Sequence, residues 1–178
     1  MTPDLEDLYR EIILDHYRNP RNTGELKSPP AIRTVGFNPL CGDEITLYLD
    51  IEGDILKDVK IDIRGCSISQ SSASMMSEAI KGKHIAEIQQ FIQSFKSMMS
   101  VHKAQLAGDE TSTQGKLADN DPGEVDDNLD DDGIVEQTLE DSKLGELTAL
   151  RGVVQFPVRI KCATLAWNTL IQGLEEVG

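Results

Sequence analysis

The sequence predicts an α+β fold in which a small antiparallel sheet of about three strands carries helices packed on one face. Two observations predict it. Residues 44–51 and 59–63 alternate between apolar and polar side chains, as strands with one buried face do. Longer segments before and after this pair repeat apolar residues at the spacing of helices. The chain of 178 residues suits one domain, which we place over 1–178.

Each predicted element has its own local signals. Asn19 and Pro20 end the first helix, whose apolar residues Leu5, Leu8 and Ile12 share one face. The alternating pair forms a hairpin, and Gly82 lies just past the end of the helix that follows it. In chain order we expect a helix over 5–17, a strand within 31–37, a hairpin over 44–63 that turns at 52–54, and helices over 67–80, 85–106 and 158–177.

Most of the negative charge lies in one window, residues 107–146. This window has fourteen acidic residues against two lysines, a net charge of −12 within a chain total of −14. A segment of this composition has too little apolar surface to fold by itself. We expect a flexible insertion within the domain, with a docking arm for a basic partner surface as the alternative.

Composition excludes several classes of function. A net charge of −14 argues against nucleic-acid binding, which requires a basic surface. No apolar run approaches the roughly 18 residues of a membrane span, so no membrane partner is expected. The first residues are acidic and lack the basic and apolar regions of a signal peptide, which favours a cytoplasmic location.

The three cysteines, Cys41, Cys66 and Cys162, are the main candidates for chemistry. They do not have zinc-finger spacing, but each lies at the boundary of a predicted element. A helix N-terminus favours thiolate over thiol, and a thiolate is both a metal ligand and a nucleophile. Asp43 follows Cys41 closely and could complete a tetrahedral Zn²⁺ site. Inert packing of three scattered cysteines stays open as the alternative.

The remaining polar candidates point to structure rather than chemistry. We expect the three histidines, His16, His84 and His102, to be structural or solvated. The serines over 67–74 do not form a Gly-x-Ser-x-Gly nucleophile motif. Their small side chains are better explained by a close approach between helices.

Four segments resemble the IscU and NifU N-terminal-domain family of iron–sulfur cluster assembly proteins, and the SufU branch most closely. The opening helix and its turn carry the first resemblance, and the segments around the three cysteines carry the others. They are Leu8-Tyr9-Arg10 with Asp15-His16-Tyr17-Arg18-Asn19-Pro20-Arg21-Asn22, Asn38-Pro39-Leu40-Cys41-Gly42-Asp43, Gly65-Cys66-Ser67-Ile68-Ser69 with Ser72-Ala73-Ser74-Met75-Met76, and Phe156-Pro157-Val158-Arg159-Ile160-Lys161-Cys162 with Ala163-Thr164-Leu165-Ala166-Trp167.

The resemblance implies a zinc site formed by Cys41, Asp43, Cys66 and Cys162. It also implies a partner, a pyridoxal-phosphate cysteine desulfurase of the SufS type, whose persulfide sulfur this protein would accept before downstream cluster assembly proteins use it. We expect Cys41 to be the acceptor, because it lies in a glycine-containing loop. The protein would then act as a zinc-dependent sulfurtransferase with that enzyme.

Two features favour the SufU branch over the IscU branch. Lys161 stands where IscU-type scaffolds carry a histidine, and SufU-type proteins have an insertion between their second and third cysteines, a region that is long here. Gly42, Arg159 and Lys161 are candidates for residues around the ligands, with Arg159 expected to partner Asp43. Two alternatives stay open: a scaffold that binds iron or a [2Fe–2S] cluster on the same ligands, and a zinc-stabilised interaction module that uses the acidic window.

Overall fold

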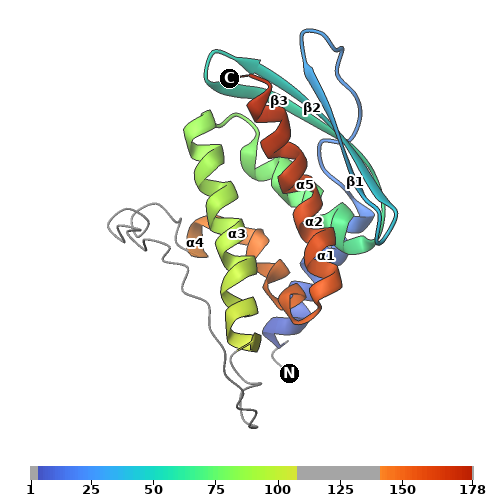
Figure 1. Cartoon of the computed structure of the whole chain (residues 1–178), viewed down its shortest axis with the longest axis vertical. Coiled ribbons are helices and arrows are strands. Elements are labelled where there is room, and N and C mark those ends of the chain that lie inside the picture. The colour runs from blue at the N-terminus through green and yellow to red at the C-terminus, as the bar shows by residue number, and fades with distance from the viewer. Residues whose placement is uncertain (1–3, 108–140, 178) are drawn as a thin grey trace, which may run out of the picture.

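A computed structural model describes residues 4–107 and 141–177 of the chain and confirms the predicted α+β fold (Figure 1). Three strands form one sheet, and helices cover one of its faces. In chain order the elements are α1 (Leu5–Arg18), β1 (Ile32–Asn38), β2 (Asp43–Glu52), β3 (Ile55–Arg64), α2 (Ser67–Ile80), α3 (Ile85–Ala107), α4 (Asp141–Leu144), the 3₁₀ helix η1 (Gly145–Gln155) and α5 (Pro157–Glu175).

The sheet is antiparallel with strand order β1-β2-β3. The strand expected within 31–37 is β1, and the expected hairpin is β2 and β3. The side chains of Ile45, Leu47 and Leu49 are fully buried, so the alternation in the sequence identified the face that packs against the helices. Asn38 pairs with Asp43 at the end of the β1–β2 ladder, which places the loop containing Cys41 at one end of the sheet.

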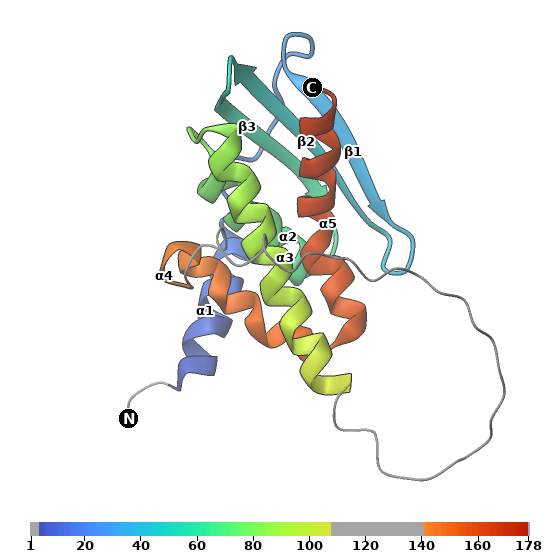
Figure 2. The same ribbon diagram turned by 60° about the vertical axis from the view of Figure 1, so that its left-hand side comes forward.

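Helix α5 lies across the sheet, over β1 and β2 (Figures 1 and 2). Two glycines permit this close approach. A Cβ atom at Gly36 of β1 would overlap the Thr169 side chain of α5. A Cβ atom at Gly173 of α5 would lie 2.8 Å from the Leu49 side chain and 3.0 Å from that of Thr34. The sheet therefore fixes the position of α5, and with it the position of Cys162.

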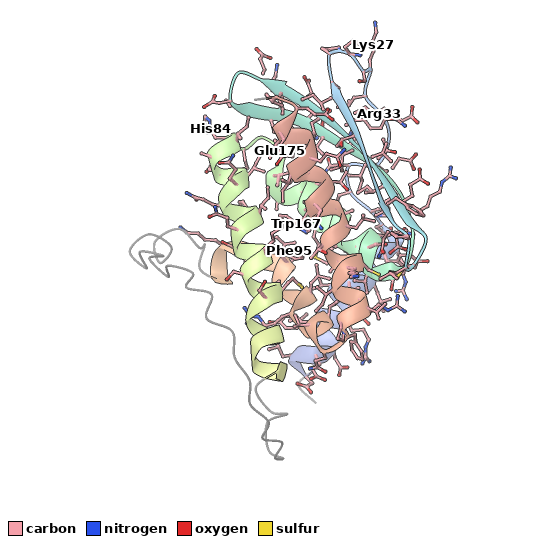
Figure 3. The ribbon with its side chains drawn as sticks, viewed as in Figure 1. Lys27, Arg33, His84, Phe95, Trp167 and Glu175 are labelled. Carbon is pink, nitrogen blue, oxygen red and sulfur yellow. The ribbon has the colours of Figure 1, made fainter. Side chains whose placement is uncertain are left out.

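The core between α2, α3 and α5 includes one aromatic pair, Phe95 and Trp167 (Figure 3). Their rings stack with centroids 4.4 Å apart. The Trp167 indole donates a hydrogen bond to Ser72 Oγ (3.2 Å), and Ser72 donates to the Ala163 carbonyl (2.6 Å). Ser72 is thus a small residue between packed helices, as the sequence indicated, and its hydroxyl also joins α2 to α5.

Helix α1 follows the predicted apolar face only in its second half, where Ile12 and Ile13 pack against the core. Leu5 and Leu8 are 57% and 50% exposed, whereas His16 is fully buried. The N-terminal turns of α1 point away from the sheet, so the helix packs mainly through its other end (Figure 2). Apolar periodicity located the helix, but it could not show which turns contact the body.

The last residues of the acidic window, 141–146, are helical in the structure. Asp141 already begins α4, Leu144 is buried, and Glu146 bonds to His16. Residues 108–140 lie outside the described part of the chain, so the predicted flexibility and docking role of the window stay predictions. Among the described helices, none is both long and apolar enough to span a bilayer.

Candidate metal centre

The loop that carries Cys41 is a tight turn between β1 and β2. The Gly42 N–H donates to the Asn38 carbonyl (2.8 Å), and the Leu40 N–H donates to the Asn38 side-chain oxygen (3.2 Å). Gly42 has a φ of +71°, a conformation that residues with a side chain rarely adopt. Because the turn holds Cys41 at the end of the sheet, its thiol is exposed.

Asp43 is the first residue of β2, and its side chain is 1% exposed. Its Oδ1 accepts a hydrogen bond from the Cys66 N–H at 3.1 Å. This contact requires Gly65, since a Cβ atom there would lie 2.5 Å from Asp43 Oδ1 and 2.5 Å from Ser69 Oγ. A carboxylate is thus held in a buried position against the start of α2.

Cys66 is the N-cap residue of α2, between the end of β3 and the helix. Its Sγ lies 3.9 Å from Asp43 Oδ2 and 3.7 Å from Ser69 Oγ. The predicted position of Cys66, after a strand and before a helix, is confirmed. The partial positive charge of the helix N-terminus favours a negative group at this point.

Cys162 is the sixth residue of α5 and is fully buried. Its Sγ lies 3.3 Å from Cys41 Sγ and 4.0 Å from the Asn38 side-chain nitrogen. Burial raises the pKa of the Cys162 thiol, and hydrogen bonds with Cys41 and Asp43 act in the same direction. Cys162 therefore keeps its proton unless a cation displaces it.

The fold brings all four predicted ligands to one end of the sheet. Cys41 Sγ, Cys162 Sγ and a carboxylate oxygen of Asp43 lie within 4.8 Å of one another, whereas Cys66 joins this group through Asp43. Three sulfurs and one carboxylate suit Zn²⁺ and are also compatible with iron. Gly65 is compatible with this assignment, because the space beside it holds the Asp43 carboxylate together with the Ser69 hydroxyl. The residues present therefore fit a metal ion.

The centre opens into a cleft of about 670 Å³. Cys41, Asp43 and Cys66 line it together with residues 155–159, the segment in which α5 begins. Two residues of that segment, Phe156 and Val158, are 61% and 59% exposed despite their apolar side chains. The thiol of Cys41 is thus accessible beside an exposed apolar edge.

Comparison with known proteins places this geometry in a family. The model of the NifU-like N-terminal domain matches residues 8–117, which is more than half of the chain and includes Cys41, Asp43 and Cys66. The chain belongs to the NifU-like N-terminal domain family. Within this family it is 41% identical to the zinc-dependent sulfurtransferase SufU of Bacillus subtilis, over 97% of this chain and 93% of that protein.

Other members of the family are named as scaffolds. The iron-sulfur cluster assembly scaffold protein IscU of Thermotoga maritima is 31% identical over 96% of this chain and 94% of that protein. Among solved structures, a putative iron-sulfur cluster assembly scaffold protein for the SUF system from Fervidobacterium islandicum matches with a TM-score of 0.69. It is 27% identical, and the match covers 96% of this chain and 99% of that one. The predicted family and fold are both confirmed.

The three residues predicted to surround the ligands differ in their positions. The Cys66 thiolate raises the pKa of the Arg159 guanidinium, followed by contacts with Cys162. Arg159 is thus influenced by those two sulfurs, and its expected pairing with Asp43 stays a prediction. Lys161 is exposed on α5, and Gly42 provides the turn that presents Cys41.

Sequence reasoning missed two residues that build the centre, Asn38 and Gly65. Asn38 caps the Cys41 turn and directs its amide toward Cys162, and Gly65 admits the Asp43 carboxylate. A signal existed for each. An Asn three residues before a cysteine, in a segment with Pro and Gly, is typical of a side-chain-capped turn. A glycine directly before a cysteine marks a position where another group can approach the backbone closely.

Proposed function

We propose that this protein accepts persulfide sulfur from a cysteine desulfurase at a zinc-bound centre formed by Cys41, Asp43, Cys66 and Cys162. The observation that carries the proposal is the contrast between its two closest sulfurs, which lie 3.3 Å apart. Cys41 is exposed, and Cys162 is fully buried. The thiol of Cys41 can therefore react with an incoming sulfur, while the thiol of Cys162 remains buried in the protein.

The reaction requires ligands that hold the metal in place and one cysteine that can accept sulfur, and the residues fit both roles. Bound at this centre, zinc would keep its cysteine ligands deprotonated and protect them from oxidation. Cys162 and Cys66 lie on helices that pack against the body, so they suit ligands that stay in place. Cys41 lies in a turn, where small changes of backbone angle move its sulfur. Arg159, beside Cys66 and Cys162, stabilises negative charge on those two sulfurs.

The chemical step is a transfer of one sulfur atom. The Cys41 thiolate attacks the outer sulfur of the persulfide on the desulfurase cysteine. A new S–S bond forms on Cys41, and the S–S bond to the desulfurase cysteine breaks, which leaves a thiolate there. The transferred sulfur keeps its proton, so no oxidant or reductant is consumed.

The partner must bring its persulfide to the exposed thiol of Cys41. Exposed apolar side chains flank this thiol: Leu40 in the same turn, and Phe156 and Val158 along the cleft. Apolar groups around an accessible reactive atom favour a protein partner over a small charged substrate. We assign this edge to a desulfurase of the SufS type that uses pyridoxal phosphate, and later release of the sulfur to cluster assembly proteins.

The test is a single-turnover reaction with a persulfide-loaded desulfurase. Alkylation and mass spectrometry of the products should locate one added sulfur on Cys41, and desulfurase turnover should rise when the protein is added. Cys41→Ala should abolish both effects. Cys66→Ala removes a ligand but keeps the acceptor, so it should still take up sulfur in one turnover. Uptake of sulfur by Cys41→Ala would refute the assignment.

A second candidate function is a scaffold on which a [2Fe–2S] cluster assembles. It is favoured by the ligand set, because thiolates bind iron as well as zinc, and by the 31% identity to a protein named as such a scaffold. Metal analysis followed by anaerobic reconstitution with iron and sulfide separates the two functions. Tight stoichiometric zinc that iron does not displace supports the acceptor, and a stable, transferable cluster supports the scaffold.

A further inference from the structure

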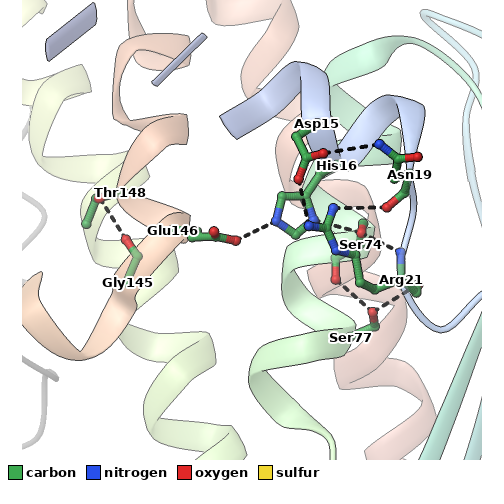
Figure 4. Close-up of polar contacts among 9 residues, drawn as sticks. All are labelled: Asp15, His16, Asn19, Arg21, Ser74, Ser77, Gly145, Glu146 and Thr148. Carbon is green, nitrogen blue, oxygen red and sulfur yellow. Dashed lines mark hydrogen bonds and ion pairs between the residues drawn. The ribbon is translucent and has the colours of Figure 1, made fainter. Parts of the chain in front are cut away.

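A second group of polar side chains lies away from the cysteines, where α1, α2 and η1 meet (Figure 4). Its centre is His16, a fully buried side chain of α1. His16 Nδ1 lies 2.8 Å from Ser74 Oγ, and His16 Nε2 lies 2.6 Å from Glu146 Oε2. The sulfur-acceptor function makes no use of this histidine.

A third side chain, Glu78, completes the group. Ligand atoms of His16, Glu78 and Glu146 lie within 4.8 Å of one another. His16 is buried at the base, and both carboxylates approach it from the solvent side. Within the described part of the chain, no hydrogen bond uses the Glu78 carboxylate. Two carboxylates therefore lie near one imidazole, and among the described contacts only that of Glu146 is hydrogen bonded to it.

We propose that His16, Glu78 and Glu146 form a binding site for a divalent transition-metal ion. One imidazole nitrogen and two carboxylate oxygens suit Mn²⁺, Fe²⁺ or Zn²⁺, and they lack the thiolates that favour Cu⁺. Two carboxylates and a neutral imidazole balance the charge of a divalent ion. An ion with bonds of about 2.1 Å holds its ligands roughly 3 Å apart, so the three side chains need to move little.

Ser74 is the residue that lets His16 serve as a ligand. A metal-bound histidine uses the lone pair of one nitrogen and donates the other N–H to a polar neighbour. Ser74 Oγ can accept from His16 Nδ1–H, as it accepts from the Arg21 N–H at 2.9 Å. In the absence of a metal the same hydroxyl can donate to Nδ1, while Nε2–H donates to Glu146. Both ring nitrogens of His16 thus have a partner in either state: Ser74 at Nδ1, and Glu146 or the metal at Nε2.

Space for further ligands lies beside the two carboxylates. Glu78 and Glu146 line a hollow of about 300 Å³ at the surface, which can admit water molecules to complete the coordination. Lys143 lines the same hollow, but within the described residues no ion pair joins it to either carboxylate. The hollow therefore leaves this cluster accessible to a cation from solvent.

The site is separate from the cysteine centre. Cys66 precedes α2 and Glu78 lies near its other end, so the two are twelve residues apart, or roughly 18 Å along the helix. The ligand chemistry also differs, since Mn²⁺ prefers oxygen and nitrogen and binds thiolates weakly. An ion at this second site would connect α1, α2 and η1, which come from three distant parts of the sequence.

The test uses the full chain with one equivalent of Zn²⁺ already bound, followed by titration with Mn²⁺. Loss of the electron paramagnetic resonance signal of free Mn²⁺ reports binding. We expect saturable binding near one equivalent in the wild type. Glu78→Gln should weaken it at least about tenfold, because it removes one ligand and leaves the His16–Glu146 contact in place.

The matched control is Asp54→Asn. Asp54 forms an exposed pair with His84 at 3.2 Å, so this change removes the same charge beside a histidine that belongs to no group of three metal-ligand side chains among the described residues. The control also accounts for cations attracted to the acidic window. The control should bind Mn²⁺ like the wild type, and Mn²⁺ should raise the melting temperature of the wild type and the control but not of Glu78→Gln. Equal Mn²⁺ binding by Glu78→Gln and Asp54→Asn would overturn the proposal.

Discussion

The cysteine centre and the His16 cluster (His16, Ser74, Glu78 and Glu146) both assemble polar side chains from distant segments, but they are built differently. Around the cysteines the contacts between side chains involving sulfur span 3.3–4.0 Å, and one thiol is exposed. Around His16 the two ring contacts measure 2.6 and 2.8 Å, and the ring is fully buried. The sulfur and carboxylate atoms of the cysteine centre therefore remain available to a metal ion. Both ring nitrogens of His16, in contrast, already have hydrogen-bond partners.

This difference assigns reactivity to one region of the fold and stability to the other. Side chains that form no short hydrogen bonds with one another can bind a metal and react, but they contribute little to the stability of the fold. A buried histidine that is hydrogen bonded on both sides holds helices together whether or not an ion is present. Changes at the cysteine centre should therefore affect zinc affinity, whereas changes at His16 should affect folding even in the metal-free protein.

The largest expected effect is at Cys162. Cys162→Ala removes a buried ligand and should weaken zinc binding by more than about 100-fold, since losing a residue that merely supports a ligand already costs 10–100-fold. Competition with a chromophoric chelator measures this. Thr164→Ala is the control on the same helix, because the Thr164 hydroxyl bonds to helix carbonyls. Equal zinc affinity in the two variants would exclude Cys162 as a ligand.

His16→Ala should lower the free energy of unfolding by about 2–3 kcal/mol, because it leaves a cavity and removes one buried and one partly buried hydrogen bond. Urea denaturation of the metal-free protein measures the change. His84→Ala, which removes an exposed histidine, should cost less than about 0.5 kcal/mol. Zinc affinity at the cysteines should stay at the wild-type value in both variants. A large loss of zinc affinity in His16→Ala would mean that the two regions are coupled.

Gly65→Ala should weaken zinc binding by about 10–100-fold, because the new Cβ displaces the Asp43 carboxylate. The matched control is Gly152→Ala, where an added Cβ meets no atom within 4 Å. The same chelator competition measures both variants. Wild-type affinity in Gly65→Ala would indicate that Asp43 does not bind the metal.

The smallest expected effect is that of a change of one pH unit on zinc affinity in the wild type. Because burial raises the pKa of Cys162, zinc must displace a proton from this thiol, and affinity should rise with pH. Between about pH 6 and pH 8 the expected gain is roughly tenfold per pH unit for each proton released. Calorimetry in buffers with different ionisation enthalpies counts those protons. An affinity independent of pH would mean that Cys162 binds no metal as a thiolate.

Periodicity in the sequence was sufficient for the fold but not for every contact. The alternation through Ile45, Leu47 and Leu49 identified both the hairpin and its buried face, since a strand in a sheet has one fixed geometry. The apolar face of α1 was only partly right, because Ile12 and Ile13 pack against the core whereas Leu5 and Leu8 are exposed. Which turn of a helix meets the body depends on tertiary packing, and periodicity carries no information about it.

The sequence was sufficient to predict the four candidate ligands but not the residues that position them. Resemblance around the three cysteines supplied four residues, and the fold brings those residues together. The roles of Asn38 and Gly65 depend on where atoms of other segments lie, so sequence reasoning missed them. The His16 cluster was missed for the same reason, because His16 and Glu146 are 130 residues apart.

The distance along the chain between Cys41 and Cys162, 121 residues, has a consequence for biosynthesis. A ribosome releases the N-terminus first, so Cys41, Asp43 and Cys66 are exposed to solvent long before α5 exists. The complete ligand set forms only when the last helix docks across the sheet. Metal capture at full affinity is thus a late event, and a chain that stops before Pro157 lacks the buried sulfur that completes the site.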